Sequence, residues 1–151
     1  MTKTILITGS TDGIGLLTAK NLAKEGHKIL LHGRGAAKLE AAVTKVGGNV
    51  ETFAADLSRM ADIQTRAAGV REKHDRLDVL INNAGVLKIA ATKTEAGHDV
   101  RFMVNTFAPY ALTRALLPII PKDGRVVNLS SAAQAPIDLA AMRGEKQLGD
   151  N

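Results

Sequence analysis

The sequence contains no cysteine and no tryptophan, and aromatic residues make up only 3% of its 151 residues. Without thiols the chain forms neither disulfides nor thiolate zinc sites, and it has no cysteine nucleophile. A cysteine-free chain fits a reducing compartment. The apolar residues before Gly9 are too few for the core of a secretion signal. We therefore expect a cytoplasmic protein.

Long apolar runs are also missing, and no segment approaches the roughly 18 residues of a membrane span. A chain of this length can bury about 70% of its unfolded surface in one domain. Hydrophobic residues at 45% and charged residues at 23% match an ordinary globular protein. The composition therefore predicts a single domain over residues 1–151, with no membrane partner.

The formal net charge is +5, which by itself is compatible with nucleic acid binding. The lysines and arginines are scattered singly, however, and the scarcity of aromatic residues leaves no stacking platform for single strands. No recognition-helix pattern is present. We therefore expect no nucleic acid partner, and a modest positive field would equally suit a polyphosphate cofactor.

A glycine-rich turn follows the first predicted strand. Residues 4–7 form an apolar, partly β-branched run typical of a buried strand, and helical periodicity extends over residues 16–25. Between them lies Thr8-Gly-Ser-Thr-Asp-Gly-Ile-Gly15. Such glycines let the backbone turn tightly and approach a diphosphate, and the helix start offers N–H groups to an anion. The spacing is G-x-x-x-G-x-G and not G-x-G-x-x-G, so an ordinary βα turn is the alternative.

The rest of the chain alternates predicted strands and helices. Apolar runs predict further strands at residues 28–31, 50–54, 77–81 and 125–129. Helical patterns lie between them, with Ser58 and Thr94 as expected N-caps. Asn105 is polar and precedes Pro109 by four residues, which predicts an irregularity inside a long helical segment. The pattern indicates an α/β fold, a Rossmann-type doubly wound parallel sheet of about five strands in the order 3-2-1-4-5.

Basic residues follow the second predicted strand, where a dinucleotide fold meets the adenosine ribose. An acidic residue at this point would bind the 2′-hydroxyl and repel a 2′-phosphate, but the chain has His32-Gly33-Arg34, and Lys38 one helical turn later. The Arg34 guanidinium can hold a phosphate through charge-assisted bonds of about 1.5–3 kcal/mol. This favours NADP(H) over NAD(H), and a solvated arginine at a helix start is the alternative.

Polar side chains follow the other predicted strands. Asp56 comes after the third strand, Asn82-Asn-Ala-Gly85 after the fourth, and Ser130-Ser131 after the fifth. The carboxyl ends of parallel strands are where ligands meet an open α/β sheet. Asp56 is placed to accept the adenine amino group, although a role as a turn residue is equally compatible with its position.

In this order, the glycine turn, Asn-Asn-Ala-Gly, Val-Asn-Thr around Asn105 and Val-Asn-Leu-Ser-Ser ending at Ser131 resemble the short-chain dehydrogenase/reductase family, in particular its retinol-dehydrogenase-like members. The resemblance implies hydride transfer between a nicotinamide and an alcohol or carbonyl substrate. It implies that Asn105 holds a proton-relay water and that Ser131 polarises the substrate oxygen. With Arg34, the expected cofactor-binding residues are Gly9, Ser10, Thr11, Gly13, Ile14, Gly15, Asp56, Leu57, Asn83, Ala84 and Gly85.

The family also uses Tyr-x-x-x-Lys, in which the tyrosine exchanges the hydroxyl proton beside an ammonium group. The only tyrosine, Tyr110, is followed by Arg114 in place of lysine, and arginine does not cycle a proton near neutral pH. We expect Tyr110 to pack within its helix. The chain is thus expected to be a truncated, inactive cofactor-binding part, incomplete relative to the family. A non-catalytic NADP(H)-binding or regulatory module, complete as given, is the alternative.

Three smaller expectations concern the remaining residues. Residues 132–151 resemble the insertion that precedes the tyrosine in retinol-dehydrogenase-like members, and we expect a partly ordered tail or insertion. The fifth strand would be an open apolar edge, which favours a homo-oligomer. The histidines stand alone without ligand spacing, so we expect no metal site and surface positions for each, namely His27, His32, His74 and His98.

Overall fold

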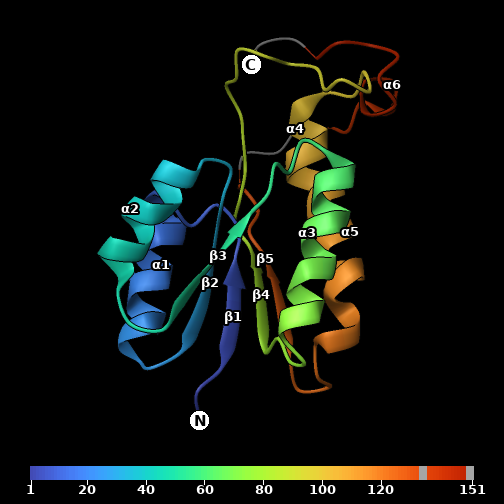
Figure 1. The fold of residues 1–151 in the computed structure, drawn as a ribbon. Coiled ribbons are helices and arrows are strands. Elements are labelled where there is room, and N and C mark those ends of the chain that lie inside the picture. Colours follow the sequence, from blue (N-terminus) through green and yellow to red (C-terminus); the bar gives the residue numbers. More distant parts are fainter. Residues whose placement is uncertain (133–135, 149–151) are drawn as a thin grey trace.

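The computed structural model describes residues 1–132 and 136–148, and in this part of the chain a parallel sheet lies between two layers of helices (Figure 1). The strand order is β3-β2-β1-β4-β5, which confirms the predicted α/β fold and its topology. The order reverses beside β1, so the carboxyl ends of β1 and β4 border the switch point at which open α/β sheets bind ligands. The strands are β1 (Thr4–Ile7), β2 (Lys28–Gly33), β3 (Val50–Ala54), β4 (Val79–Asn82) and β5 (Arg125–Asn128).

Helices cover both faces of the sheet. On one face lie α1 (Gly13–Lys24) and α2 (Ala36–Val46), and on the other lie α3 (Met60–Lys73) and α5 (Ala108–Leu116) (Figure 1). Successive residues of β1 point to opposite faces, so Ile5 and Ile7 join the core beneath α1 and α2, whereas Leu6 joins the core beneath α3 and α5. The shorter elements are α4 (Val100–Phe102), the π-helix η1 (Met103–Phe107), the 3-10 helix η2 (Leu117–Ile119) and α6 (Leu139–Met142).

The helix starts differ from the predicted ones. Asp12 caps α1 by accepting the Gly13 N–H, so this helix begins three residues before the predicted Leu16. Ser58 is not an N-cap, because its N–H and hydroxyl both bind Asp56 Oδ1, at 2.9 and 2.8 Å, and hold it in the preceding turn. Because these bonds hold Ser58 in the turn, α3 begins at Met60 and not directly after Ser58.

Thr94 was also wrongly expected to cap a helix. Its hydroxyl accepts the N–H of His98 at 3.1 Å inside a loop, and Asp99 caps α4 instead. The irregularity predicted at Asn105 is confirmed, because Asn105 lies within η1. The Ala108 N–H donates to the Met103 carbonyl, an i+5 bond, and the carbonyl of Asn105 lacks the i+4 donor of an α-helix because Pro109 has no N–H.

Tyr110 does not pack in the core, contrary to expectation. The buried face of α5 consists of Ala108, Leu112 and Leu116, which recur every four residues. Tyr110 lies off this face and its side chain is 69% exposed. The error arose because an aromatic residue in an apolar helix does not by itself define which side faces the sheet.

The segment from residue 136 to 148 returns over the loop that follows β4. Asp138 caps α6, and Ala141 of this short helix is fully buried. Of the predicted tail or insertion, residues 133–135 and 149–151 lie outside the described residues. In the described ranges, no helix has the length and apolar character needed to cross a bilayer.

Candidate functional site

The glycine turn between β1 and α1 is packed against the segment that follows β4. Gly9 has φ +63°, and a Cβ on it would lie 2.9 Å from Ala84 Cα. A Cβ on Gly15 would meet the carbonyl oxygen of Gly9 and would lie 2.5 Å from Asn83 Nδ2. Both positions therefore require glycine for close backbone approach, which leaves the start of α1 facing the carboxyl edge of the sheet.

Thr8 and Asn83 connect the same two segments through hydrogen bonds. The Thr8 hydroxyl accepts the backbone N–H groups of Asn83 and Ala84, at 2.9 Å each. The Asn83 side-chain amide donates to the carbonyls of Thr8 at 2.8 Å and Gly9 at 3.1 Å. The Asn83 side-chain nitrogen thus holds the turn, and residues 83–85 line the open groove.

His32, at the end of β2, is buried, so the expected surface position was wrong. Its side chain is 3% exposed, and its ring Nδ1 accepts the Gly9 N–H at 2.9 Å. Its Nε2 lies 3.1 Å from the carbonyl oxygen of Ala55, at the end of β3. Burial lowers the pKa of His32 to about 4. Sequence position alone could not reveal this, because the three segments meet only in the sheet.

Ser10 and Asp56 are both involved in local hydrogen bonds. The Ser10 hydroxyl is fully buried, donates to the Ile7 carbonyl and accepts the His32 N–H, each at 2.8 Å. Asp56 is a turn residue, because its Oδ1 accepts both polar hydrogens of Ser58. It also borders the groove described next, so both roles considered for Asp56 fit its position.

A groove of about 700 Å³ runs along the carboxyl ends of the strands. Sequence reasoning did not select several of its lining residues, including Arg59 and Glu95, whose side chains lie 3.7 Å apart. Among the other expected cofactor residues, Gly13 and Ile14 are exposed in the first turn of α1. The expected residues that line the groove are Gly9, Thr11, Arg34, Asp56, Leu57, Asn83, Ala84 and Gly85.

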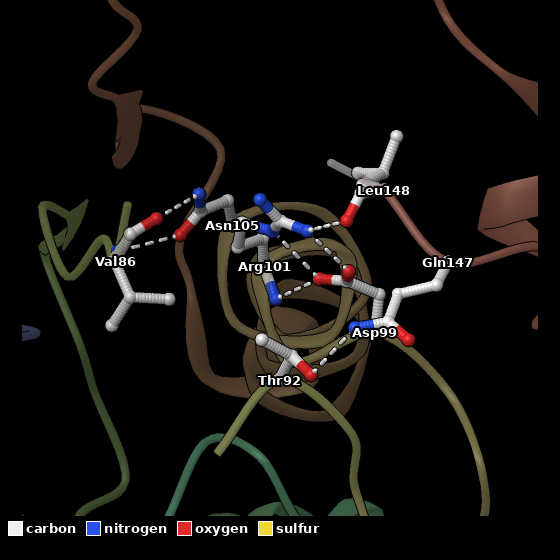
Figure 2. A network of polar contacts seen from close by, with 7 residues as sticks. All are labelled: Val86, Thr92, Asp99, Arg101, Asn105, Gln147 and Leu148. Carbon is white, nitrogen blue, oxygen red and sulfur yellow. Dashed lines mark hydrogen bonds and ion pairs between the residues drawn. The ribbon is translucent and has the colours of Figure 1, made fainter. Parts of the chain in front are cut away.

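Asn105 and Ser131, the two expected catalytic residues, line a second hollow of about 850 Å³ on the other side of residues 83–85. The Asn105 side chain is tied to the backbone of Val86 in both directions, because Oδ1 accepts its N–H and Nδ2 donates to its carbonyl, at 2.8 Å each (Figure 2). Tyr110 borders the same hollow. Asn105 and Ser131 thus line the same hollow, and the side-chain amide of Asn105 holds the loop at Val86.

Two further contacts that sequence reasoning missed hold the hollow together. The buried Asn82 amide donates to Thr113 Oγ1 at 3.2 Å and to Asn128 Oδ1 at 2.8 Å. These bonds join the end of β4 to α5 and to the end of β5. The contact between Asn82 and Asn128 could have been predicted from the sequence, because both are polar residues at the ends of neighbouring strands. They are partners in the strand register.

A buried ion pair holds the loop before α4. Arg101 Nη2 lies 2.8 Å from Asp99 Oδ2, and the side chains are 13% and 5% exposed. Hydrogen bonds from Arg101 hold the pKa of Asp99 below its usual range. Arg101 also donates to the Leu148 carbonyl at 3.2 Å, and Gln147 contacts Thr92 (Figure 2). The segment ending at Leu148 is therefore anchored on the loop that borders the groove. In the described ranges, no group of three or more acidic or histidine side chains is placed to hold a metal ion.

Comparison with known proteins places this architecture in a family. A model of the short chain dehydrogenase family matches residues 3–140. Retinol dehydrogenase 13 of Homo sapiens is 38% identical over 138 residues, which cover 87% of this chain and 42% of that protein. The chain thus spans less than half the length of this relative.

Solved structures agree with the sequence comparison. A metagenomic short-chain oxidoreductase in complex with NADP has a TM-score of 0.77 and 35% identity, covering 94% of this chain and 71% of that one. A short-chain dehydrogenase from Sphingobium yanoikuyae in complex with NADPH has a TM-score of 0.73 and 33% identity, covering 86% and 54%. Together with the family match over most of the chain, these likenesses show that the chain belongs to the short-chain dehydrogenase/reductase family of oxidoreductases.

Proposed function

We propose that this chain binds NADP(H) along the carboxyl ends of its strands and forms the cofactor-binding part of an enzyme that transfers hydride between the nicotinamide and an alcohol or carbonyl substrate. The observation that carries the proposal is the cradle at the switch point. Side chains on Gly9 or Gly15 would collide with the segment at residues 83–84 or with the turn itself. Such close packing leaves backbone N–H groups and the positive end of α1 for a diphosphate.

The rest of the groove suits the two ends of a dinucleotide. Arg34, Asp56 and Leu57 line the side formed by β2 and β3, where we place the adenosine. Residues 83–85 separate the groove from the hollow that contains Asn105 and Ser131, where we place the nicotinamide and the substrate. When bound, the nicotinamide supplies or accepts the hydride, and the protein orients the reacting groups.

A preference for NADP(H) over NAD(H) is part of the proposal. Arg34 is exposed at the end of β2 and borders the groove, and it can form charge-assisted bonds with a 2′-phosphate. Arg59 borders the same groove, but Glu95 lies 3.7 Å from it, so Arg34 is the residue on which the preference rests. The similar structures that contain NADP or NADPH support this choice by analogy.

We further propose how Asn105 and Ser131 act in the complete site. Because both polar atoms of the Asn105 side chain bind Val86, a relay water would be held by its main-chain carbonyl. That carbonyl has no i+4 N–H donor, because residue 109 is proline. Ser131 is exposed at the same hollow and would hydrogen-bond the substrate oxygen.

The cofactor proposal is tested by titrating the chain with NADPH and following the fluorescence of the reduced nicotinamide. We expect saturable binding that adenosine 2′,5′-bisphosphate reverses by competition. A titration without saturation would refute the proposed NADP(H) site.

An assay of carbonyl-dependent NADPH oxidation then tests whether the chain also catalyses hydride transfer or only binds the cofactor. We expect binding without turnover from these 151 residues, because their one tyrosine is followed by Arg114 and not by lysine. Clear turnover would show that another group transfers the proton. A cytoplasmic location and the absence of nucleic acid and membrane partners stay predictions from composition.

A further inference from the structure

We infer that His32 is a positioning residue for the adenosine side of the cofactor site, where its neutral ring holds the glycine turn against the end of β3. The inference rests on the proposed NADP(H) site. His32 was not among the residues expected to bind the cofactor; it lines the groove, but both of its ring nitrogens lie within hydrogen-bond distance of groups of the protein. Its effect on the cofactor would therefore pass through Gly9 and the Ala55–Asp56 segment.

The hydrogen bonds determine the tautomer of the ring. The Gly9 N–H can only donate, so Nδ1 of His32, 2.9 Å away, must be unprotonated and accept. The Ala55 carbonyl can only accept, so Nε2, 3.1 Å away, must carry the proton. The neutral Nε2–H form satisfies both partners, whereas the alternative tautomer and the imidazolium would each direct an N–H toward the Gly9 N–H.

The backbone and the ring of His32 make further contacts. The backbone N–H of His32 donates to Ser10 Oγ at 2.8 Å, and the ring lies against Phe53 with centroids 5.5 Å apart. The Ala55 N–H in turn donates to the Gly33 carbonyl at 3.2 Å. Hydrogen bonds thus connect the ends of β2 and β3 and the glycine turn around His32.

The residues connected in this way flank the groove. Gly9 belongs to the turn that faces the proposed diphosphate, and Ala55 precedes Asp56, which lines the adenosine side. Releasing the ring would free the turn and the Asp56 segment to shift relative to each other. Cofactor affinity should fall because the free protein would no longer be preorganised.

The charged groups around the ring are Arg34 at the end of β2, and Asp56 and Asp62 from the segment after β3 and from α3. Arg34 disfavours protonation of the ring, and the two carboxylates favour it. The largest effect is burial, which disfavours the charged form, so the pKa of His32 lies near 4. The ring is therefore neutral at physiological pH, as its hydrogen bonds require.

The test compares His32→Phe and His32→Asn with wild type in binding NADPH and adenosine 2′,5′-bisphosphate. Phenylalanine keeps the ring but leaves the Gly9 N–H and the Ala55 carbonyl unpaired, so we expect about ten-fold weaker binding of both ligands, the equivalent of one lost hydrogen bond. Asparagine can still accept from Gly9 and should recover part of that loss. His27→Asn, at the opposite end of β2, is the matched control and should bind as wild type does.

Ring ¹⁵N NMR of the wild-type chain is the second measurement, and it does not depend on the variants folding. We expect the Nε2–H tautomer at neutral pH. A protonated or Nδ1–H ring would overturn the inference, and so would a folded His32→Phe chain that binds both ligands as wild type does. In those cases wild-type binding leaves the proposed function intact. If wild type itself binds neither ligand, the proposed function fails, and this role fails with it.

Discussion

Thr8 and Asn83 satisfy each other's polar groups across the switch point of the sheet. The Thr8 hydroxyl accepts the Asn83 N–H at 2.9 Å, and the Asn83 amide donates to the Thr8 carbonyl at 2.8 Å. Thr8 is 2% exposed, so these groups have little access to water. The pair joins the first glycine of the cradle to the segment that separates the groove from the substrate hollow.

Replacing Thr8 by valine keeps the shape of the side chain but removes the acceptor of the Ala84 N–H, and it leaves the Asn83 N–H with the Ile81 carbonyl alone, 3.1 Å away. We expect Thr8→Val to lower the free energy of unfolding by about 1–3 kcal/mol, measured by urea denaturation. Thr8→Ser retains the hydroxyl and should lose less. Equal stability of the two variants would show that the hydroxyl contributes little to holding the two segments together.

Gly15 should not tolerate a methyl group. A Cβ there would meet the Gly9 carbonyl oxygen and the Asn83 amide, so Gly15→Ala is expected to destabilise the chain by about 1–3 kcal/mol and to weaken NADPH binding. Gly69, inside α3, has no atom within 4 Å of a built Cβ. Gly69→Ala is the control and should stabilise by about 0.5–1 kcal/mol, because alanine favours helix. Thermal melts of both variants check the opposite signs.

Arg34→Asp should reverse the proposed preference between cofactors. Removing the cation and adding a carboxylate repels the 2′-phosphate and offers an acceptor to a 2′-hydroxyl. We expect NADPH affinity to fall by roughly 10- to 150-fold, with a smaller change or a gain for NADH. Arg71→Asp makes the same charge change away from the groove. If wild type binds NADH as tightly as NADPH, the preference is wrong.

The stability of the chain should depend on the protonation of His32. Burial lowers its pKa from 6.5 to about 4 in the folded state, so between these values the unfolded chain binds more protons. Its contribution is complete above pH 6.5 and is lost as the pH falls toward 4, at up to about 1.4 kcal/mol per pH unit. Urea denaturation at pH 7 and pH 5 should show this slope in wild type. A matching slope in His32→Asn would assign it to other groups.

The edge of the sheet at β5 should mediate self-association. Within the described residues β4 is the strand that pairs with β5, and Val127 and Leu129 are 41% and 44% exposed. Open strand edges with apolar side chains pair readily with other chains. We expect sedimentation velocity to show an oligomer that Val127→Lys weakens, whereas Thr65→Lys, on the surface of α3, leaves it unchanged. A monomeric wild-type chain would contradict this prediction.

Much of the fold could be predicted because its signals are local. Apolar runs predicted the buried strands, and Asn105 before Pro109 predicted an irregularity that the structure shows to be a π-helix, since a missing N–H and a poor helix former act within one turn. The helix starts at Ser58 and Thr94 were wrong for a related reason. Capping residues also bind in turns, and the choice depends on which donor the folded loop presents.

The candidate site likewise has features that the sequence predicted and features that it did not. Asn105 and Ser131 line one hollow, and their catalytic roles stay predictions from the motifs, which did not reveal that the amide of Asn105 is bound to Val86. The exposure of Tyr110 was missed because helical periodicity locates an apolar face only approximately. Arg101 and Asp99 were missed because neither their burial nor their contact with Leu148 is visible along the chain.

The sequence by itself determined the alternation of strands and helices, the glycine turn and the family, because these follow from residue patterns that act over short distances. The tertiary structure decided what those residues contact. His32 is the clearest case, since an isolated histidine became a buried, neutral group between Gly9 and Ala55. The physical reason is that burial and hydrogen-bond partners come from parallel strands that lie side by side in space although they are far apart in the chain.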